Sequence, residues 1–296
     1  MEKKEHILLA FLLNLGFSLL ELAGGLLTGS TAVLSDAVHD FGDAVSIGCA
    51  WLLERKSRKK PDATHTFGYV RYSVLGGLLT TLILVLGSVV VITNAVGRLF
   101  APVSIHYDGM LVLAAIGLAV NLVAALVTRH GHSLNQRAVN LHMLEDVLGW
   151  AVVLVGAVIM RFADWPLLDP LLSMGVAVYI LRHAWVHFRQ ILGILLEQTP
   201  EGAEPARLRQ SLCALEGVED VHHIHLWSLD GCHTCATMHV VATGESQDVK
   251  QAVRRALRLQ DICHVTLELE RPGECCHAQS CGIYPPKPGV SCCHHR

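Results

Sequence analysis

Six long apolar segments dominate the first two thirds of the chain. A helix needs about 20 mostly apolar residues to cross the hydrocarbon core of a bilayer. The approximate bounds of the segments are residues 7–28, 31–53, 73–100, 107–128, 137–160 and 166–188. No small-residue cleavage site follows the first segment, so we expect it to be retained. The pattern predicts an α-helical polytopic membrane domain with six transmembrane helices over residues 1–199.

The pattern changes after Pro200 to shorter, alternating elements. It predicts a helix over 204–215, strands over 218–229 and 234–243, a helix over 247–259 and a last strand over 262–270. Asp230-Gly231 between the first two strands is a turn signal. The order α-β-β-α-β predicts a small α+β domain over residues 200–271, with two helices on one face of a three-stranded sheet. We expect no packed core in the Cys- and Pro-containing tail, residues 272–296.

Composition and charge agree with this division. The chain has 52% hydrophobic and 17% charged residues, which is typical of a polytopic membrane protein. Its net charge of -3 argues against a nucleic-acid partner. Basic residues cluster at the start, in the segment 55–60 and around Arg129 and Arg137. The positive-inside rule therefore predicts an integral membrane protein with both termini in the cytoplasm.

Two of the apolar segments carry the same motif, H-x-x-x-D. The first contains His39 and Asp43, and the second contains His142 and Asp146. On a helix, residues four apart lie on one face, so each segment offers an imidazole and a carboxylate in one direction. Two such faces make a four-ligand N/O site that suits tetrahedral zinc. The alternative is a pair of structural polar contacts between helices, but ionisable residues inside membranes are usually functional.

The cysteines concentrate near the carboxyl end, where nine of the ten follow residue 200. Cys232 and Cys235 form a C-x-x-C in a predicted hairpin loop, which is a metal-binding pattern. In the tail, cysteines stand beside histidines in Cys275-Cys276-His277 and in Cys292-Cys293-His294-His295. Thiolate and imidazole attract zinc and copper(I), so these pairs predict a flexible metal-capturing segment. A passive, tolerated chain end is the alternative.

Taken together, these features resemble the cation diffusion facilitator family, and within it the zinc-transporting branch. The resemblance covers residues 1 to about 271. It is carried by Ser35-Asp36-Ala37-Val38-His39-Asp40-Phe41-Gly42-Asp43, by His142-x-x-x-Asp146, by His65-Thr66-Phe67-Gly68-Tyr69-x-Arg71 and by Val221-His222-His223-Ile224-His225-Leu226-Trp227. It implies a homodimeric antiporter in the lipid bilayer that exports divalent metal against protons. It also implies a metallochaperone-like fold for the cytoplasmic domain.

The resemblance assigns the transport site to His39, Asp43, His142 and Asp146. Histidine at the first position favours zinc, with cadmium second, because imidazole suits zinc whereas oxygen-rich sites suit manganese. In the cytoplasmic domain, the resemblance implies that zinc is bound by three histidines that match ligand positions of the family. These are His222, His239 and His264, and the alternative for each is a surface or packed histidine without a metal.

Three further expectations follow from the resemblance and from strand periodicity. Some relatives bind a second metal between helices two and three with an aspartate and two histidines. Asp62 and His65 are present here but Tyr69 takes the last position, so we interpret this site as vestigial. Family members also pair a basic and an acidic residue near the hinge, which predicts an Arg71–Glu197 ion pair. Alternation along the strand puts His223 and His225 on the face opposite His222, and His225 with Trp227 is interpreted as structural.

The sequence therefore predicts a zinc/proton antiporter of the cell (inner) membrane rather than an enzyme. Zinc is expected as the substrate and as a structural or regulatory ligand, with cadmium as a second substrate and without an organic cofactor. A membrane-embedded metalloenzyme needs a general base beside the metal, and the chain has no H-E-x-x-H. A membrane-anchored metal sensor or storage protein is the remaining alternative, but it leaves the intramembrane His and Asp pairs unexplained.

Overall fold

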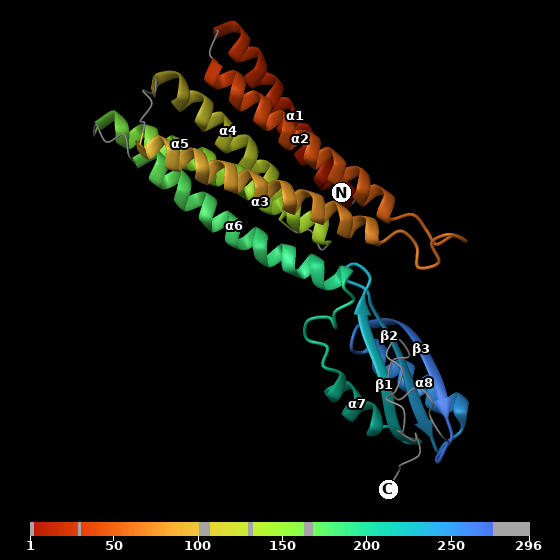
Figure 1. The fold of residues 1–296 in the computed structure, drawn as a ribbon. Helices are drawn as coiled ribbons and strands as arrows, with labels where there is room; N and C mark the ends of the chain where they lie inside the picture. Colours follow the sequence, from red (N-terminus) through yellow and green to blue (C-terminus); the bar gives the residue numbers. More distant parts are fainter. Residues whose placement is uncertain (1–2, 29–30, 101–106, 130–132, 163–167, 275–296) are drawn as a thin grey trace, which may run out of the picture. The chain divides into compact units, whose positions relative to one another are not determined.

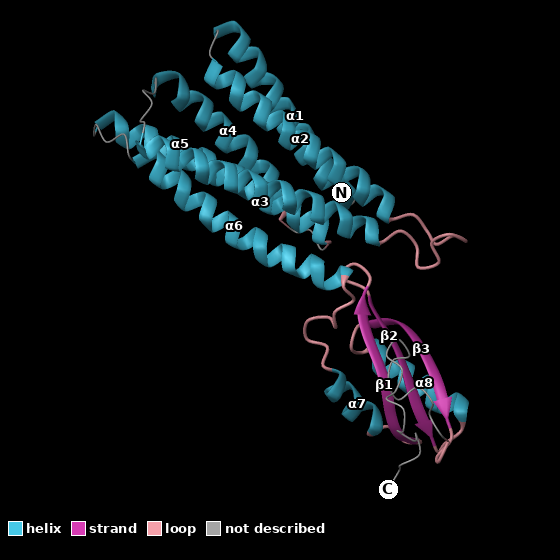
Figure 2. Cartoon of the chain, in the orientation of Figure 1, coloured by secondary structure: helices cyan, strands magenta, loops and turns pink. Residues whose placement is uncertain are grey.

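The computed structural model describes residues 3–28, 31–100, 107–129, 133–162 and 168–274. The chain divides into two compact units, Met1–Ile191 and Leu192–Arg296. The first unit is entirely helical where it is described, and every strand of the described chain belongs to the second unit (Figures 1 and 2). Each unit is considered by itself below.

The first unit is built from long helices that follow the six apolar segments, as predicted. They are α1 (Lys3–Thr28), α2 (Thr31–Ser57), α3 (Arg71–Phe100), α4 (Tyr107–Thr128), α5 (Leu134–Phe162) and α6 (Leu168–Leu195). The helices α2 and α6 run several residues beyond their predicted ends. A helix does not stop where its apolar segment stops, because its backbone hydrogen bonds continue through a more polar sequence until a turn signal ends it.

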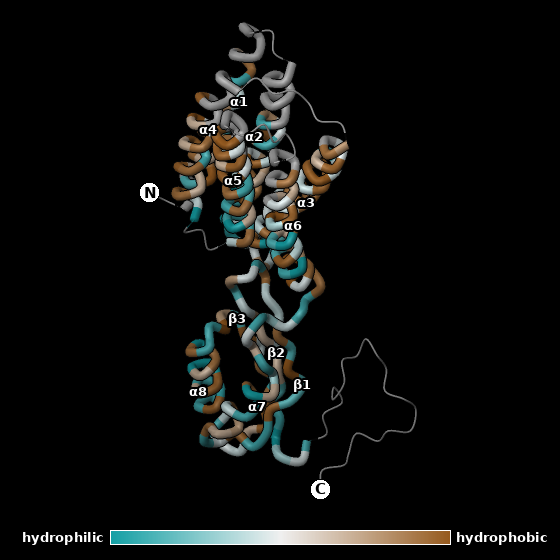
Figure 3. Tube along the Cα trace, turned by 90° about the vertical axis from the view of Figure 1, so that its left-hand side faces the viewer, coloured by the Kyte–Doolittle hydropathy of each residue, from teal (hydrophilic) through white to brown (hydrophobic). Residues whose placement is uncertain are grey.

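Length and composition alone qualify three stretches of the described chain as membrane spans: His6–Ala23, Arg71–Gly97 and Leu134–Gly156. Hydrophobic residues predominate along α3 and α4 in Figure 3. By contrast, α2 carries Asp36, Asp40 and Asp43 in its first half and the charged residues Glu54, Arg55 and Lys56 near its end. Ionisable groups at this depth must face the interior of a bundle or water, and the packing of α2 shows which.

Small residues bring α1, α2, α4 and α5 close together around one core. Each helix contributes two buried residues to this core. They are Ile7 and Ala10, Ile47 and Ala50, Ala124 and Ala125, and Val139 and Met143. On α4, a Cβ at Gly117 would stand 2.7 Å from the ring of Trp150 on α5, so only glycine permits this approach. A separate small cluster of Leu84, Ile180 and Ala184 joins α3 to α6.

The second unit has the predicted order α-β-β-α-β. It contains α7 (Pro205–Cys213), β1 (Val218–Ser228), β2 (Thr234–Ala242), α8 (Ser246–Arg258) and β3 (Ile262–Glu270). The strand order is β1-β2-β3, with β1 antiparallel and β3 parallel to β2. The parallel pair requires a crossover, which α8 supplies. Val249, Val253 and Leu257, four residues apart along α8, are buried against the sheet.

Candidate metal sites

One histidine and two carboxylates meet in the interior of the first unit. Asp43 comes from α2, whereas His142 and Asp146 come from α5. One ligand atom of each lies within 4.8 Å of the other two, and Asp43 Oδ1 is 3.6 Å from His142 Nε2. Asp43 and His142 are buried, with 6% and 4% of their surfaces exposed. The acidic middle of α2 therefore faces α5.

The fourth predicted ligand, His39, lies in α2 one turn before Asp43, but its side chain is outside the part of the structure that is described. The prediction from its i, i+4 spacing, that it shares a face of α2 with Asp43, stays a prediction. The helix α1 adds the buried Asn14, whose Nδ2 donates a hydrogen bond to Asp146 Oδ2 at 3.5 Å. Sequence reasoning gave Asn14 no role in the site, because no local spacing connects it to residues in α5.

A third carboxylate, Glu145, lies behind His142. Glu145 Oε2 is 3.8 Å from His142 Nδ1, and Ser88 Oγ on α3 is 3.5 Å from Glu145 Oε1. The two nitrogens of the imidazole thus face two different carboxylates. Sequence reasoning missed Glu145, although its position three residues after His142 puts the two on neighbouring parts of the α5 surface.

This group can hold one divalent cation. Two ionised carboxylates balance the charge of the ion, and the imidazole supplies a softer nitrogen ligand. Such a mixture of N and O ligands is typical of zinc. Buried charges are tolerated in a membrane when they pair or coordinate a metal. A metal bound between α2 and α5 would therefore explain why these helices carry charged side chains in the interior of the bundle.

A second buried carboxylate cluster ties three helices together near the start of α5. Glu54 on α2 is 5% exposed and accepts hydrogen bonds through Oε2. The donors are Ser73 Oγ at 2.9 Å, Ser133 Oγ at 3.1 Å and Asn135 Nδ2 at 3.3 Å. These contacts join α2 to α3 and to the beginning of α5. They also give Ser73 a structural role.

In the segment between α2 and α3, Lys59 forms an ion pair with Asp62. Lys59 Nζ lies 3.1 Å from both Asp62 Oδ2 and Tyr69 Oη, and the Tyr69 hydroxyl donates to Asp62 Oδ2 at 2.7 Å. The ring of His65 stacks on Tyr69 at 4.1 Å. The aspartate thus already has a cation beside it, which supports the interpretation of this site as vestigial.

The same contacts hold Asp62 in its ionised form. Hydrogen bonds from the Tyr69 hydroxyl, then from Thr64 and Lys59, keep the pKa of the Asp62 carboxyl far below its ordinary value. The hydrogen bond with Tyr69, followed by the one with Asp62, raises the pKa of Lys59. Each partner favours the charged form of the other.

The sheet of the second unit carries a β-bulge inside the histidine run of β1. His222 pairs with His239 and His225 with Thr237, so three steps along β1 oppose two along β2. His223 is the extra residue of the bulge. Its φ is 49°, a left-handed conformation that non-glycine residues seldom adopt. The ring of His223 stacks on His239 at 4.8 Å and lies 4.6 Å from His225.

The expectation that His223 and His225 lie opposite His222 is therefore wrong. Strict alternation holds only for a regular strand, and the bulge shifts the alternation by one residue. It gathers four imidazoles along one stretch of β1 and β2. Burial, followed by the charges of His225, His239 and His222, lowers the pKa of His223.

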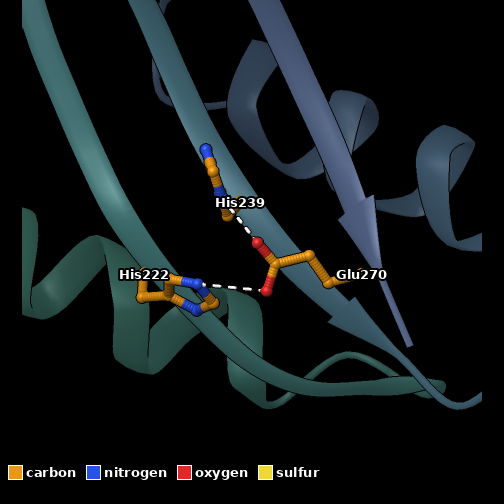
Figure 4. Close-up of side chains that lie close together, drawn as sticks. All are labelled: His222, His239 and Glu270. Carbon is orange, nitrogen blue, oxygen red and sulfur yellow. Dashed lines mark hydrogen bonds and ion pairs between the residues drawn. The ribbon is translucent and has the colours of Figure 1, made fainter. Parts of the chain in front are cut away.

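Two of these histidines form a potential metal site with Glu270 at the end of β3 (Figure 4). Glu270 Oε1 lies 2.6 Å from His239 Nδ1, and Glu270 Oε2 lies 3.2 Å from His222 Nε2. On the other side of the His239 ring, Nε2 is 3.3 Å from Glu268 Oε2. Glu270 is 7% exposed, so its charge is held inside the fold by the two imidazoles.

His264, the third predicted ligand, is not part of this group. The parallel register puts His264 beside Cys235 and Glu268 beside His239. The residues of β3 next to the histidine pair are therefore Glu268 and Glu270, which follow His264 by four and six residues. The family resemblance had implied His264, and the sequence could not test it because the register between β2 and β3 cannot be read from either strand alone.

The C-x-x-C pair is split between a turn and a strand. Cys232 is exposed in the β1–β2 turn, whereas Cys235 is fully buried in β2. Within the described residues, neither cysteine belongs to a group of three close potential ligands. The tail residues Cys275, Cys276, His277, Cys292 and Cys293 lie outside the described residues.

The helical bundle with buried N and O ligands, followed by a small α+β domain with a second such group, defines a polytopic membrane protein that handles divalent metal. Residues 7–196 match the family model for the cation efflux transmembrane domain, and residues 200–272 match the cytoplasmic domain of cation efflux proteins. The chain belongs to the cation efflux family. This confirms the resemblance on which the sequence-based expectations rest.

The chain is similar to several relatives along nearly its whole length. It is 32% identical to the zinc transporter ZitB of Escherichia coli (strain K12) over 98% of the chain and 94% of the relative. It is 31% identical to the cadmium, cobalt and zinc/H(+)-K(+) antiporter of Bacillus subtilis (strain 168), over 90% and 89%. The metal cation efflux system protein CzcD of Cupriavidus metallidurans is 31% identical over 86% and 82%.

Proposed function

We propose that this protein is a zinc/proton antiporter that exports Zn²⁺, with Cd²⁺ as a second substrate, from the cytoplasm by alternating access. The observation that carries the proposal is the group of Asp43, His142 and Asp146 inside the helical unit. The names of its relatives, which include a zinc transporter and a zinc/H(+)-K(+) antiporter, support it. They give no support to the alternative of a metal sensor or storage protein.

Proton coupling follows from the chemistry of the ligands. Zinc binds a neutral imidazole and ionised carboxylates, so its arrival displaces any protons on them. When zinc leaves, the low dielectric disfavours two uncompensated carboxylates, and protonation relieves this. Metal and protons thus compete for one site, and alternating access converts the competition into antiport.

The assembly and orientation belong to the same proposal. The match of residues 200–272 to the family's cytoplasmic domain supports a homodimer that pairs through this domain. The basic segment after α2 supports cytoplasmic termini, and the cell (inner) membrane is the proposed location. In this arrangement the group of His222, His239 and Glu270 is a cytoplasmic zinc site. The Arg71–Glu197 ion pair joins residues of different units and stays a prediction.

Zinc flux into sealed proteoliposomes tests the transport site. Asp43→Ala or Asp146→Ala removes one ligand and half of the compensating charge. Loss of a residue that only supports a metal ligand typically lowers activity about 10–100-fold. We expect loss of a ligand itself to lower zinc flux by more than this. Arg254→Ala, on the exposed side of α8, is the matched control and should transport normally. Near wild-type flux in both aspartate variants would show that zinc crosses elsewhere.

A further inference from the structure

A basic hollow opens between the end of α4, the beginning of α5 and the middle of α6. It has a volume of about 680 Å³ and is lined by three arginines, two histidines, three neutral polar residues and three apolar residues. The arginines are Arg129, Arg137 and Arg182. No acidic residue lines it in the described part of the chain. Among the described residues, neither Arg137 nor Arg182 has a carboxylate partner. Arg137 and Arg182 therefore bring two positive charges to the hollow without a described carboxylate partner.

This hollow is separate from the metal group. On α5 its lining includes Arg137, Leu141 and Leu144, which lie at i, i+4 and i+7 and share one face. His142 and Asp146 follow Arg137 by five and nine residues, which rotates them by about 140° and 180° around the helix. The hollow thus opens on the side of α5 opposite the metal ligands.

The depth of the hollow matches the edge of a bilayer. His187 Nε2 lies 3.0 Å from the carbonyl oxygen of Leu134, the first residue of α5. Arg182 is five residues from His187, or about 7.5 Å along α6. The headgroup region extends about 5–8 Å beyond the hydrocarbon core on each side. Arg182 precedes His187 and Arg137 follows Leu134 by three residues, so both Cα atoms lie within about 8 Å of the level of Leu134, on its inner side. Long guanidinium side chains reach outwards from this depth to the headgroups, here those of the leaflet at the start of α5, which is the cytoplasmic one in the proposed orientation.

The apolar part of the lining continues from the basic part towards the middle of the membrane. Leu141 and Leu144 lie about 10 and 15 Å from Leu134 along α5, and 37% of the surface of Leu144 is exposed. A ligand that fills the hollow must carry negative charge at one end and a hydrocarbon chain at the other. Basic pockets between transmembrane helices at the cytoplasmic side are suited to anionic lipid headgroups.

We propose that this hollow binds an anionic phospholipid of the cytoplasmic leaflet. The phosphate lies between Arg137 and Arg182, and an acyl chain lies along Leu141 and Leu144. A phosphate is the appropriate partner because guanidinium groups bind it through paired N–H donors. The lipid occupies the space between α5 and α6, and its binding is independent of the metal group.

Native mass spectrometry of the full-length protein tests this proposal. The protein is extracted from vesicles with equal parts of phosphatidylcholine and phosphatidylglycerol, and the retained lipids are counted. We expect the wild type to retain phosphatidylglycerol preferentially. Arg137→Gln with Arg182→Gln should lower this preference about 30-fold. Arg189→Gln is the matched control, since Arg189 is also on α6 but its guanidinium lies over the Trp185 ring, 5.5 Å from the centroid.

Three outcomes complete the test. Arg137→Lys with Arg182→Lys keeps the charge and should keep most of the preference, even if the glutamine variant does not fold. Equal retention of the two lipids by the wild type would overturn the proposal. Displacement of the lipid by an equal concentration of inorganic phosphate would also overturn it, because the ligand would then be a free anion rather than a lipid.

Discussion

At the residue scale, His142 has the most informative surroundings. Its Nε2 faces Asp43 at 3.6 Å and its Nδ1 faces Glu145 at 3.8 Å. A histidine that binds metal through one nitrogen usually donates the N–H of the other to a carboxylate, which sets the tautomer and the ring orientation. At 3.8 Å the Glu145 carboxylate is beyond hydrogen-bond distance of Nδ1, so we expect it to move closer and accept this N–H when Nε2 binds the cation.

Glu145→Gln tests this positioning role. The amide keeps the size of the side chain but removes the charge that stabilises the Nδ1–H tautomer. We expect the KM for zinc to rise about 10–100-fold, with a smaller change in the maximal rate once the site is saturated. Proteoliposome flux at several zinc concentrations separates the two constants.

Ser88→Ala is the control for Glu145, because Ser88 Oγ contacts Glu145 Oε1, whereas Glu145 Oε2 faces His142. The Ser88 hydroxyl also donates to the Leu84 carbonyl oxygen within α3. It should change KM much less than Glu145→Gln does. Cobalt in place of zinc supplies a second reading, since its visible absorption depends on ligand geometry and should change in the glutamine variant. An unchanged KM together with an unchanged cobalt spectrum would rule out the positioning role.

At the element scale, the bulge in β1 decides what the second unit can bind. Without the extra residue at His223, strict alternation would point His222 and His225 to opposite faces. The bulge depends on the left-handed conformation of His223, with a φ of 49°. Glycine and asparagine tolerate this conformation, whereas a β-branched residue does not.

His223→Val should therefore destabilise the second unit by about 1–2 kcal/mol, and it should weaken zinc binding at His222 and His239. His223→Asn should preserve the bulge and both properties, although it removes the same imidazole. Hydrogen exchange of β1 amides in the full-length protein measures the stability, and zinc titration measures the binding. If valine and asparagine behaved alike, the imidazole rather than the bulge would be the important feature.

At the scale of the whole molecule, proton coupling follows from the ligands of the transport site. A solvated histidine has a pKa of about 6.5 and exchanges protons near cytoplasmic pH. Protonation of a ligand opposes zinc binding, so apparent affinity should fall as pH drops from about 7.5 to 6. An inward proton gradient should drive zinc out. If zinc flux into proteoliposomes depended on neither pH nor the proton gradient, antiport against protons would be excluded.

Residues close in sequence could be assigned to one another without a structure. The six apolar segments predicted the six helices, and the order of the last elements was correct. The i, i+4 spacing by itself put His142 on the face of α5 that carries Asp146. These inferences succeed because hydrogen bonds within an element set its periodicity, and periodicity decides which neighbours share a face.

Only the tertiary structure decided which elements meet, and with which residues. The parallel register selected Glu270 rather than His264 beside His222 and His239. Packing of α1 and α3 brought Asn14 to Asp146 and Ser88 to Glu145. Register, bulges and helix contacts depend on side chains far apart in the chain. The sequence by itself therefore determined the helices, the order of the elements along the chain and the chemistry of the metal ligands. Packing determined how the strands are arranged and how each metal group is completed.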